Sequence, residues 1–184
     1  MLDAAEELLQ NGDDKNVTVE NVVRLSGATV GSFYARFGNV EGLFDALHKR
    51  YLDSIFESKI LEALNESTNQ PDLRSGLHHG CKILLEFAYE KRKLIAYFIT
   101  HPMDDALLVR QVAVESMFNN LKAHRSEVAH KDLRKASENS TRLIYYTLLG
   151  LVFLEPSEFI GRKTSLKSVI DTTTQMAYLY LTTQ

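Results

Sequence analysis

The amino-acid sequence predicts an all-α fold. Apolar residues recur at spacings of three and four almost throughout the 184 residues, whereas no segment reads as a series of alternating strands and turns. The three prolines, Pro71, Pro102 and Pro156, stand between these periodic blocks, where a residue without an N–H is tolerated best. A chain of this length is long enough to enclose a hydrophobic core.

Composition and charge are those of an ordinary globular protein. Hydrophobic residues make up 45% of the chain and charged residues 24%, and the single cysteine, Cys81, cannot form an internal disulfide. The acidic opening MLDAAEELLQ lacks the positive charge and long apolar run of a secretion signal. The longest apolar stretch, residues 143–154, has 12 residues, whereas a membrane span needs about 20. We therefore expect a cytoplasmic protein with no membrane partner.

The first two helices are indicated by the residues at their ends. A first helix ends near Asn11 and Gly12, a pair that favours a left-handed turn. Thr18 is a good N-cap for a second, short helix, and Gly27 ends it. The apolar side of the first helix consists of Leu2, Ala5, Leu8 and Leu9, and that of the second of Val22, Val23 and Leu25.

The next two helices follow in the same way. Thr29 caps a third helix, in which Phe33 and Phe37 form an apolar side at i, i+4 spacing. Its other side presents Ser32, Ala35 and Arg36. Asn39 caps a long fourth helix, expected over residues 40–65, which links the two halves of the chain.

Two short helices joined by a glycine-containing turn are typical of the helix-turn-helix, whose second helix enters the major groove of DNA. Phe33 and Phe37 would anchor that helix and leave its opposite side free for DNA. From spacing alone, a plain corner between two helices is the alternative.

The stretch TVENVVRLSGATVGSFYARFGNVEGLF, residues 18–44, resembles the DNA-binding signature of the tetracycline-repressor (TetR) family, whose usual run is close to TVDDIAEAAGVSKGTLYRHFPSKEALF. Matching or near-matching positions, without a gap, are Thr18, Val19, Gly27, Gly31, Phe33, Tyr34, Phe37, Glu41, Leu43 and Phe44. The resemblance covers about residues 1–50 and implies binding to double-stranded DNA, with the tyrosine on a phosphate. The candidate DNA-binding residues that it implies are Thr18, Thr29, Val30, Ser32, Tyr34 and Arg36.

The sequence departs from the family by losing positive charge. Val30 and Val40 stand where the family often has lysine. Residues 1–50 hold five basic against eight acidic residues, a formal net charge of −3. Because nonspecific DNA affinity comes from neutralised phosphates, we expect weak nonspecific binding with a shallow salt dependence. A degenerate module that binds no operator is the alternative.

The second half of the chain, residues 66–184, is expected to be a helical ligand-binding and dimerisation domain, separated from the DNA-binding domain of residues 1–50 near the polar run 65–72. Its helices are apolar on broad faces, and the resemblance implies a pocket for an unknown small-molecule effector. Candidate ligand-binding residues are His78, Cys81, Phe87, Tyr97, Phe98, His101, Met103, Met117, Phe118 and Tyr145. Packing in the core is the alternative for most of them.

The last two apolar blocks indicate a homodimer, because helices with extra apolar sides at the end of a chain tend to pair with themselves. The resemblance implies a four-helix bundle made by two such helices from each subunit. Gly150, in the middle of a helix, is consistent with a close helix crossing. Candidate interface residues are Leu143, Leu148, Leu151, Val152, Val169, Thr173, Met176 and Tyr180.

No catalytic or metal-binding group stands out. His78, His79 and Cys81 carry zinc-ligand chemistry, but no second Cys or His pair follows at the spacing of a zinc site, and no serine has the surroundings of a nucleophile. We expect no metal and no cofactor, and a protein that is not an enzyme. The sequence predicts a repressor that binds a palindromic operator as a homodimer and releases it when a ligand binds. There are two alternatives. One is a dimeric sensor whose helix-turn-helix does not bind DNA, and the other is a small helical enzyme or metal protein that uses residues 78–81.

Overall fold

The computed structural model describes residues 1–56, 59–101, 106–156, 158 and 164–183, and in this part of the chain every regular element is a helix, so the predicted all-α fold is confirmed. The helices are α1 Leu2–Asn11, α2 Val19–Ser26, α3 Val30–Phe37, α4 Val40–Phe56, α5 Lys59–Asn65, α6 Leu73–Glu90, α7 Arg92–Thr100, α8 Ala106–Ala123, α9 Leu133–Phe153 and α10 Leu166–Thr182. Short 3₁₀ turns cover Asp14–Asn16, Glu66–Asn69 and Arg125–Glu127. None of the helices in the described ranges is long and apolar enough to cross a bilayer.

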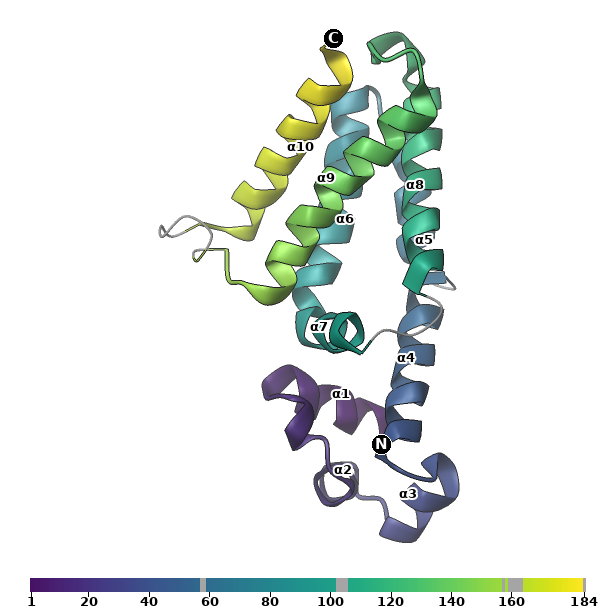
Figure 1. Cartoon of the computed structure of the whole chain (residues 1–184), viewed down its shortest axis with the longest axis vertical. Coiled ribbons are helices and arrows are strands. Elements are labelled where there is room, and N and C mark those ends of the chain that lie inside the picture. Colours follow the sequence, from purple (N-terminus) through teal and green to yellow (C-terminus); the bar gives the residue numbers. More distant parts are fainter. Residues whose placement is uncertain (57–58, 102–105, 157, 159–163, 184) are drawn as a thin grey trace.

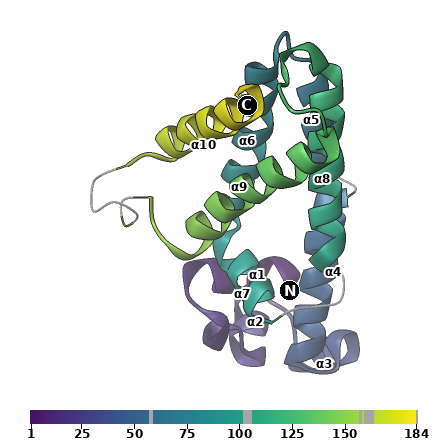
Figure 2. The same cartoon turned by 45° about the horizontal axis from the view of Figure 1, so that its top comes forward.

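The helices form two groups that α4 and α7 join (Figure 1). Helices α1–α3 lie together at one end of the molecule, and α4 leads from them along one side toward α5. Helices α6, α8, α9 and α10 pack against one another at the other end. Both views place α7 next to α1, where it also contacts α6 and α9 (Figure 2). The helix expected over residues 40–65 is present as α4 and α5 on either side of residues 57–58, which lie outside the described ranges.

The short helices at the N-terminal end begin and end where the sequence indicated. The Thr18 hydroxyl accepts a hydrogen bond from the backbone N–H of Asn21 at the start of α2. Gly27, with φ of 69°, ends this helix in the left-handed conformation that glycine adopts without steric cost. Asn39 caps α4, because its side-chain oxygen accepts a hydrogen bond of 2.8 Å from the N–H of Gly42.

One predicted turn is wrong. Helix α1 ends at Asn11 as expected, but Gly12 has φ of −144° and is therefore not left-handed. A Cβ at Gly12 would lie 2.1 Å from Nδ2 of Asn16. The glycine thus makes room for the side chain of the following 3₁₀ turn, instead of supplying a positive φ.

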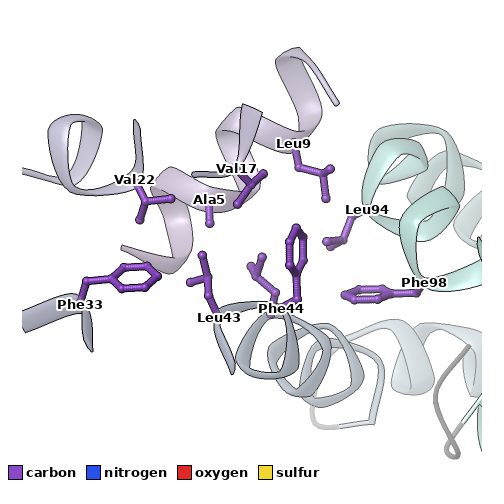
Figure 3. Packing of buried hydrophobic residues seen from close by; sticks show 10 residues of the cluster. Ala5, Leu9, Val17, Val22, Phe33, Leu43, Phe44, Leu94 and Phe98 are labelled. Carbon is purple, nitrogen blue, oxygen red and sulfur yellow. The ribbon is translucent and has the colours of Figure 1, made fainter. Parts of the chain in front are cut away.

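A hydrophobic cluster, the N-terminal core, holds the first four helices together and extends into α7. Figure 3 shows Phe33 pointing from α3 toward Leu43, and Leu94 and Phe98 reaching from α7 toward Phe44. Helix α7 is therefore part of the N-terminal core, although it is distant in sequence. The buried members of this core are Ala5, Leu9, Val17, Val22, Phe33, Leu43, Phe44, Leu47, Leu94 and Phe98.

Candidate DNA-binding face and internal cavities

Helix α3 exposes the side that the sequence assigned to DNA. Val30 and Tyr34 are 51% and 52% exposed, although both are large apolar or aromatic side chains. All six predicted DNA-binding residues are exposed: Thr18, Thr29, Val30, Ser32, Tyr34 and Arg36. They lie at the starts of α2 and α3 and along α3, so the structure brings them to one end of the molecule.

Burial of the opposite side of α3 keeps this face outward. Phe33 is fully buried, and its ring lies 5.3 Å from that of Phe37, centroid to centroid. Phe37 is partly buried against the same N-terminal core. Full burial of one phenylalanine contributes about 1.5–3 kcal/mol. The rings of Tyr34 and Phe33 meet edge to face with their centroids 5.6 Å apart. This contact restrains the Tyr34 ring, although the side chain remains half-exposed.

The hydroxyl groups at the start of α3 form a capping box. The Thr29 hydroxyl accepts a hydrogen bond from the N–H of Ser32 at 3.1 Å, and the Ser32 hydroxyl accepts one from the N–H of Thr29, also at 3.1 Å. These two side chains therefore define the start of the helix in the free protein. The groups that project from α3 are the Tyr34 phenol and the Arg36 guanidinium, which lies over the ring of Phe37 at 5.4 Å.

One of the five N-terminal basic residues is engaged in ion pairs inside the protein. The guanidinium of Arg50 binds the carboxylates of Asp3 and Glu6, and Lys91 binds the other oxygen of Glu6 at 2.8 Å. Burial alone would raise the pKa of Glu6, but the hydrogen bonds and charges of Lys91 and Arg50 outweigh it and hold that pKa below its ordinary value. This network connects α1 with α4 and with the junction of α6 and α7.

An apolar cavity of about 200 Å³, the main cavity, lies between α4 and the helices α5–α9. Its few polar groups include Tyr51, Arg110 and Tyr145, with the Arg110 guanidinium 5.1 Å from the centre of the Tyr145 ring. Burial, together with nearby Tyr145, raises the pKa of Tyr51 to about 12, so its phenol stays neutral. The lining residues are His48, Tyr51, Leu52, Ile55, Ile60, Leu64, Leu84, Phe87, Ala88, Ile95, Phe98, Ile99, Arg110, Val112, Ala113, Thr141, Ile144, Tyr145 and Leu148.

Five of the ten predicted ligand-binding residues line one of two cavities. Phe87, Phe98 and Tyr145 line the main cavity, and Cys81 and Met117 line a smaller cavity beside it. The four that line neither cavity are His78, Tyr97, His101 and Phe118. Met103 lies outside the described residues.

Each of those four side chains has another partner. Tyr97 faces the N-terminal core, where its ring stacks on Phe44 with centroids 4.1 Å apart, and the exposed His101 stacks on Tyr97. His78 bonds Asp171 of α10 at 3.2 Å. The guanidinium carbon of Arg134 lies 3.9 Å from the centre of the Phe118 ring. The spacing of apolar residues in the sequence identified the apolar side of each helix, but it does not indicate which neighbouring helix each of these residues contacts.

Sequence reasoning missed the contributions of α4 and α5 to the main cavity. Tyr51 and Ile55, at i, i+4 spacing within the expected fourth helix, were not among the predicted ligand-binding residues, and neither were Ile60 and Arg110. A signal was present, because α4 has more apolar positions than packing on the first three helices requires.

The predicted dimer residues on α9 and α10 are only partly available to another chain. Leu151, Val152 and Thr173 are buried within the protein's own core. Leu143, Leu148, Val169 and Tyr180 are half-buried, and Met176 is 55% exposed. The exposed apolar residues of these helices that the sequence analysis did not name are Tyr146, Phe153 and Leu179.

The region of His78, His79 and Cys81 does not form a metal site. The three side chains have separate surroundings: His79 bonds the carbonyl oxygen of Ala63, and burial raises the pKa of the Cys81 thiol to about 12. Among the described residues, no group of three side chains suited to a metal ion occurs.

These features define a helical protein with an exposed helix-turn-helix at one end and an internal apolar cavity behind it. Residues 1–47 match the family model described as "Bacterial regulatory proteins, tetR family". The N-terminal part of the chain thus carries a helix-turn-helix of the type found in TetR-family transcriptional regulators, as the sequence indicated. Its helix-turn-helix implies DNA binding.

Solved structures of other proteins share this fold over 96–100% of the chain. PfmR of Thermus thermophilus, a TetR-family regulator, is 12% identical, with a TM-score of 0.68 over 96% of each chain. A transcriptional regulator of Rhodococcus sp. Rha1 is 16% identical, with a TM-score of 0.68 over 100% of this chain and 96% of the other. The fatty acid degradation regulator FadR of Bacillus halodurans is 15% identical, with a TM-score of 0.62 over 96% and 95%. A search of curated proteins found no match.

Proposed function

We propose that this regulator is a cytoplasmic repressor that binds a palindromic operator as a homodimer, and that a small molecule in the main cavity weakens its binding to DNA. In this proposal residues 1–50 form the DNA-binding domain and residues 66–184 the ligand-binding and dimerisation domain. The observation that carries it is the position of α7, which belongs both to the N-terminal core and to the wall of the main cavity.

Phe98 makes this double role concrete. Its ring is a buried member of the N-terminal core and also lines the main cavity. On the same helix, Leu94 packs into the core, whereas Ile95 and Ile99 line the cavity. A ligand that displaces Phe98 would therefore act on the helices that hold α3.

Helix α4 provides a second connection. Leu43 and Leu47 pack in the N-terminal core, and Tyr51 and Ile55, further along the helix, line the main cavity. A ligand shifts the DNA-binding equilibrium only by as much as it prefers one state, and DNA must weaken ligand binding by the same factor. We expect a coupling of about 1–3 kcal/mol.

The proposed dimer uses the exposed apolar sides of α9 and α10. On α9, Tyr146 and Phe153 are two turns apart, and on α10 Met176 and Leu179 lie one turn apart; all four are about half-exposed or more. Pairing with a second copy would bury these residues in a four-helix bundle. A twofold dimer would place its two α3 helices about 34–36 Å apart, near one turn of DNA, which favours a palindromic operator.

The experiment begins with a selection of fragments of the source genome that the purified protein binds, followed by fluorescence anisotropy on the best fragment. Arg36→Ala should weaken binding about 5-fold to 100-fold, and Tyr34→Phe should weaken it less, by loss of one phosphate contact. Lys135→Ala, an exposed charge at the start of α9, is the control and should have no effect. If neither variant of α3 weakens binding to a fragment that the wild type retains, the DNA-binding face is assigned wrongly.

A second candidate function is a dimeric small-molecule sensor whose helix-turn-helix no longer binds DNA. The charge of the N-terminal end favours it, because Val30 is exposed where the family often has lysine, and Arg50 is engaged by Asp3 and Glu6. The genomic selection separates the two candidates, since a sensor without DNA binding enriches no fragment.

A further inference from the structure

The smaller cavity, about 40 Å³ and called here the polar chamber, contains hydrogen-bonding groups without partners. Its lining includes Ser67, Asn120 and Thr141. Within the described part of the chain, the hydroxyl oxygens of Ser67 and Thr141 and the side-chain carbonyl oxygen of Asn120 are buried and have no hydrogen-bond partner. Ser67 and Asn120 are each only 3% exposed. Because a buried polar group without a partner costs about 1–3 kcal/mol, three in one small cavity call for an explanation.

Two glycines in the first half of α6 keep the polar chamber open. A Cβ at Gly76 would lie 2.6 Å from Oδ1 of Asn120 and 2.7 Å from the backbone oxygen of Ser67, and a Cβ at Gly80 would lie 3.3 Å from the Ser67 hydroxyl. Glycine inside a helix costs up to about 1 kcal/mol relative to alanine. The i, i+4 spacing of this Gly-x-x-x-Gly pattern places both glycines on one side of α6.

The polar chamber lies next to the main cavity. Leu64, Leu84, Ala113, Thr141 and Ile144 line both spaces. A ligand in the main cavity would therefore lie beside the polar groups of the chamber, and Thr141 belongs to both linings. A volume of about 40 Å³ exceeds the 10–15 Å³ that one water molecule requires, so the chamber has room for a small polar group.

The chemistry of the lining selects that group. The carbonyl oxygen of Asn120 only accepts hydrogen bonds, whereas the hydroxyls of Ser67 and Thr141 donate and accept. Among the described residues, the lining of the chamber has no charged side chain, because Arg110 belongs to the lining of the main cavity, so a charged group inside the chamber would be desolvated without an opposite charge. The fitting group is uncharged and has a hydrogen to donate, as in an alcohol or a primary amide.

We propose that the polar chamber is the specificity-determining end of the effector site, and that the effector has an apolar body ending in an uncharged hydrogen-bond donor. This inference rests on the proposed binding of a small molecule in the main cavity. The group would donate to Asn120 and exchange hydrogen bonds with Ser67 and Thr141, while its apolar body contacts Phe87 and Phe98.

The test compares three compounds of similar size on the full chain: octan-1-ol, its isomer heptyl methyl ether, which has no donor, and octylammonium, which is a charged donor. Binding is measured by displacement of the neutral fluorescent dye N-phenyl-1-naphthylamine. We expect the alcohol to bind about tenfold more tightly than the ether and the ammonium ion. The double variant S67A/T141V should lower the preference for alcohol over ether at least threefold.

Two further variants complete the test. Gly80→Ala, whose new methyl group fills part of the chamber, should lower the same preference, and it serves if the double variant does not fold. Thr147→Val is the matched control, because Thr147 lies on α9 outside both cavity linings and bonds the carbonyl oxygen of Leu143. It should leave the preference unchanged.

The outcomes separate this inference from the proposed function. If all three compounds displace the dye equally, or if the preference for the alcohol survives in both chamber variants, the polar chamber does not select the ligand, and the proposed cavity site still stands. If neither the dye nor any of the compounds binds, the proposed cavity site fails together with the inference.

Discussion

Phe33 and Tyr34 are neighbours in sequence but should have opposite roles. Phe33 is fully buried in the N-terminal core, and its ring contacts the rings of Tyr34 and Phe37 with centroids 5.6 and 5.3 Å apart. Phe33→Ala removes the buried ring and leaves a cavity, so we expect the free energy of unfolding to fall by about 3–5 kcal/mol. Tyr34 is 52% exposed, so Tyr34→Ala should cost less than about 1 kcal/mol, chiefly the edge contact with Phe33.

Urea unfolding followed by circular dichroism measures both values, and anisotropy with a selected DNA fragment measures the second role. Tyr34→Ala should retain its stability and lose DNA affinity. The account of α3 is refuted if Phe33→Ala costs less than about 1 kcal/mol, or if Tyr34→Ala destabilises the protein as much as Phe33→Ala does.

Three further predictions follow from particular contacts. The pKa of Glu6 lies below its ordinary value of 4.5, so its ion pairs with Arg50 and Lys91 stabilise the fold above about pH 4.5 and are lost as the pH falls through the lower folded-state pKa. Glu6→Gln should therefore lower the free energy of unfolding at pH 7 by about 1–2 kcal/mol and flatten its decline in acid, as urea titrations at a series of pH values will show. Gly27 has φ of 69°, and an added Cβ there would meet open space among the described residues, so Gly27→Ala should cost about 1–2 kcal/mol from backbone strain alone, measured as a lower urea midpoint. Met176→Asp should convert the proposed dimer to a monomer in light scattering after gel filtration, without loss of helix content, because Met176 is 55% exposed on α10.

The N-terminal end of the fold was predictable because its determinants are local. Thr18, Thr29 and Asn39 each form the predicted cap with a backbone N–H within three residues, and Gly27 supplies the predicted positive φ. Such contacts depend on residue type and short spacing. Gly12 is the exception: its φ is −144°, and an added Cβ would meet the side chain of Asn16 in the following turn.

The cavities were less predictable because their walls combine residues from six successive helices, α4–α9, between His48 and Leu148. Tyr97 and Phe98 show the difficulty: adjacent on α7, they were both expected at the ligand, yet only Phe98 lines the main cavity. Leu151 and Val152 show the same limit on α9, where periodicity identified apolar sides but not which of them meets the rest of the chain.

Thiol protection tests most directly whether the exposed side of α3 binds DNA. Ala35→Cys places a thiol on that side, whereas the native Cys81 is 1% exposed and should not react. The account predicts rapid labelling of Ala35→Cys in the free protein and at least tenfold slower labelling in the presence of a bound DNA fragment, with no change for Lys82→Cys on α6. Equal labelling rates for Ala35→Cys with and without bound DNA would contradict it.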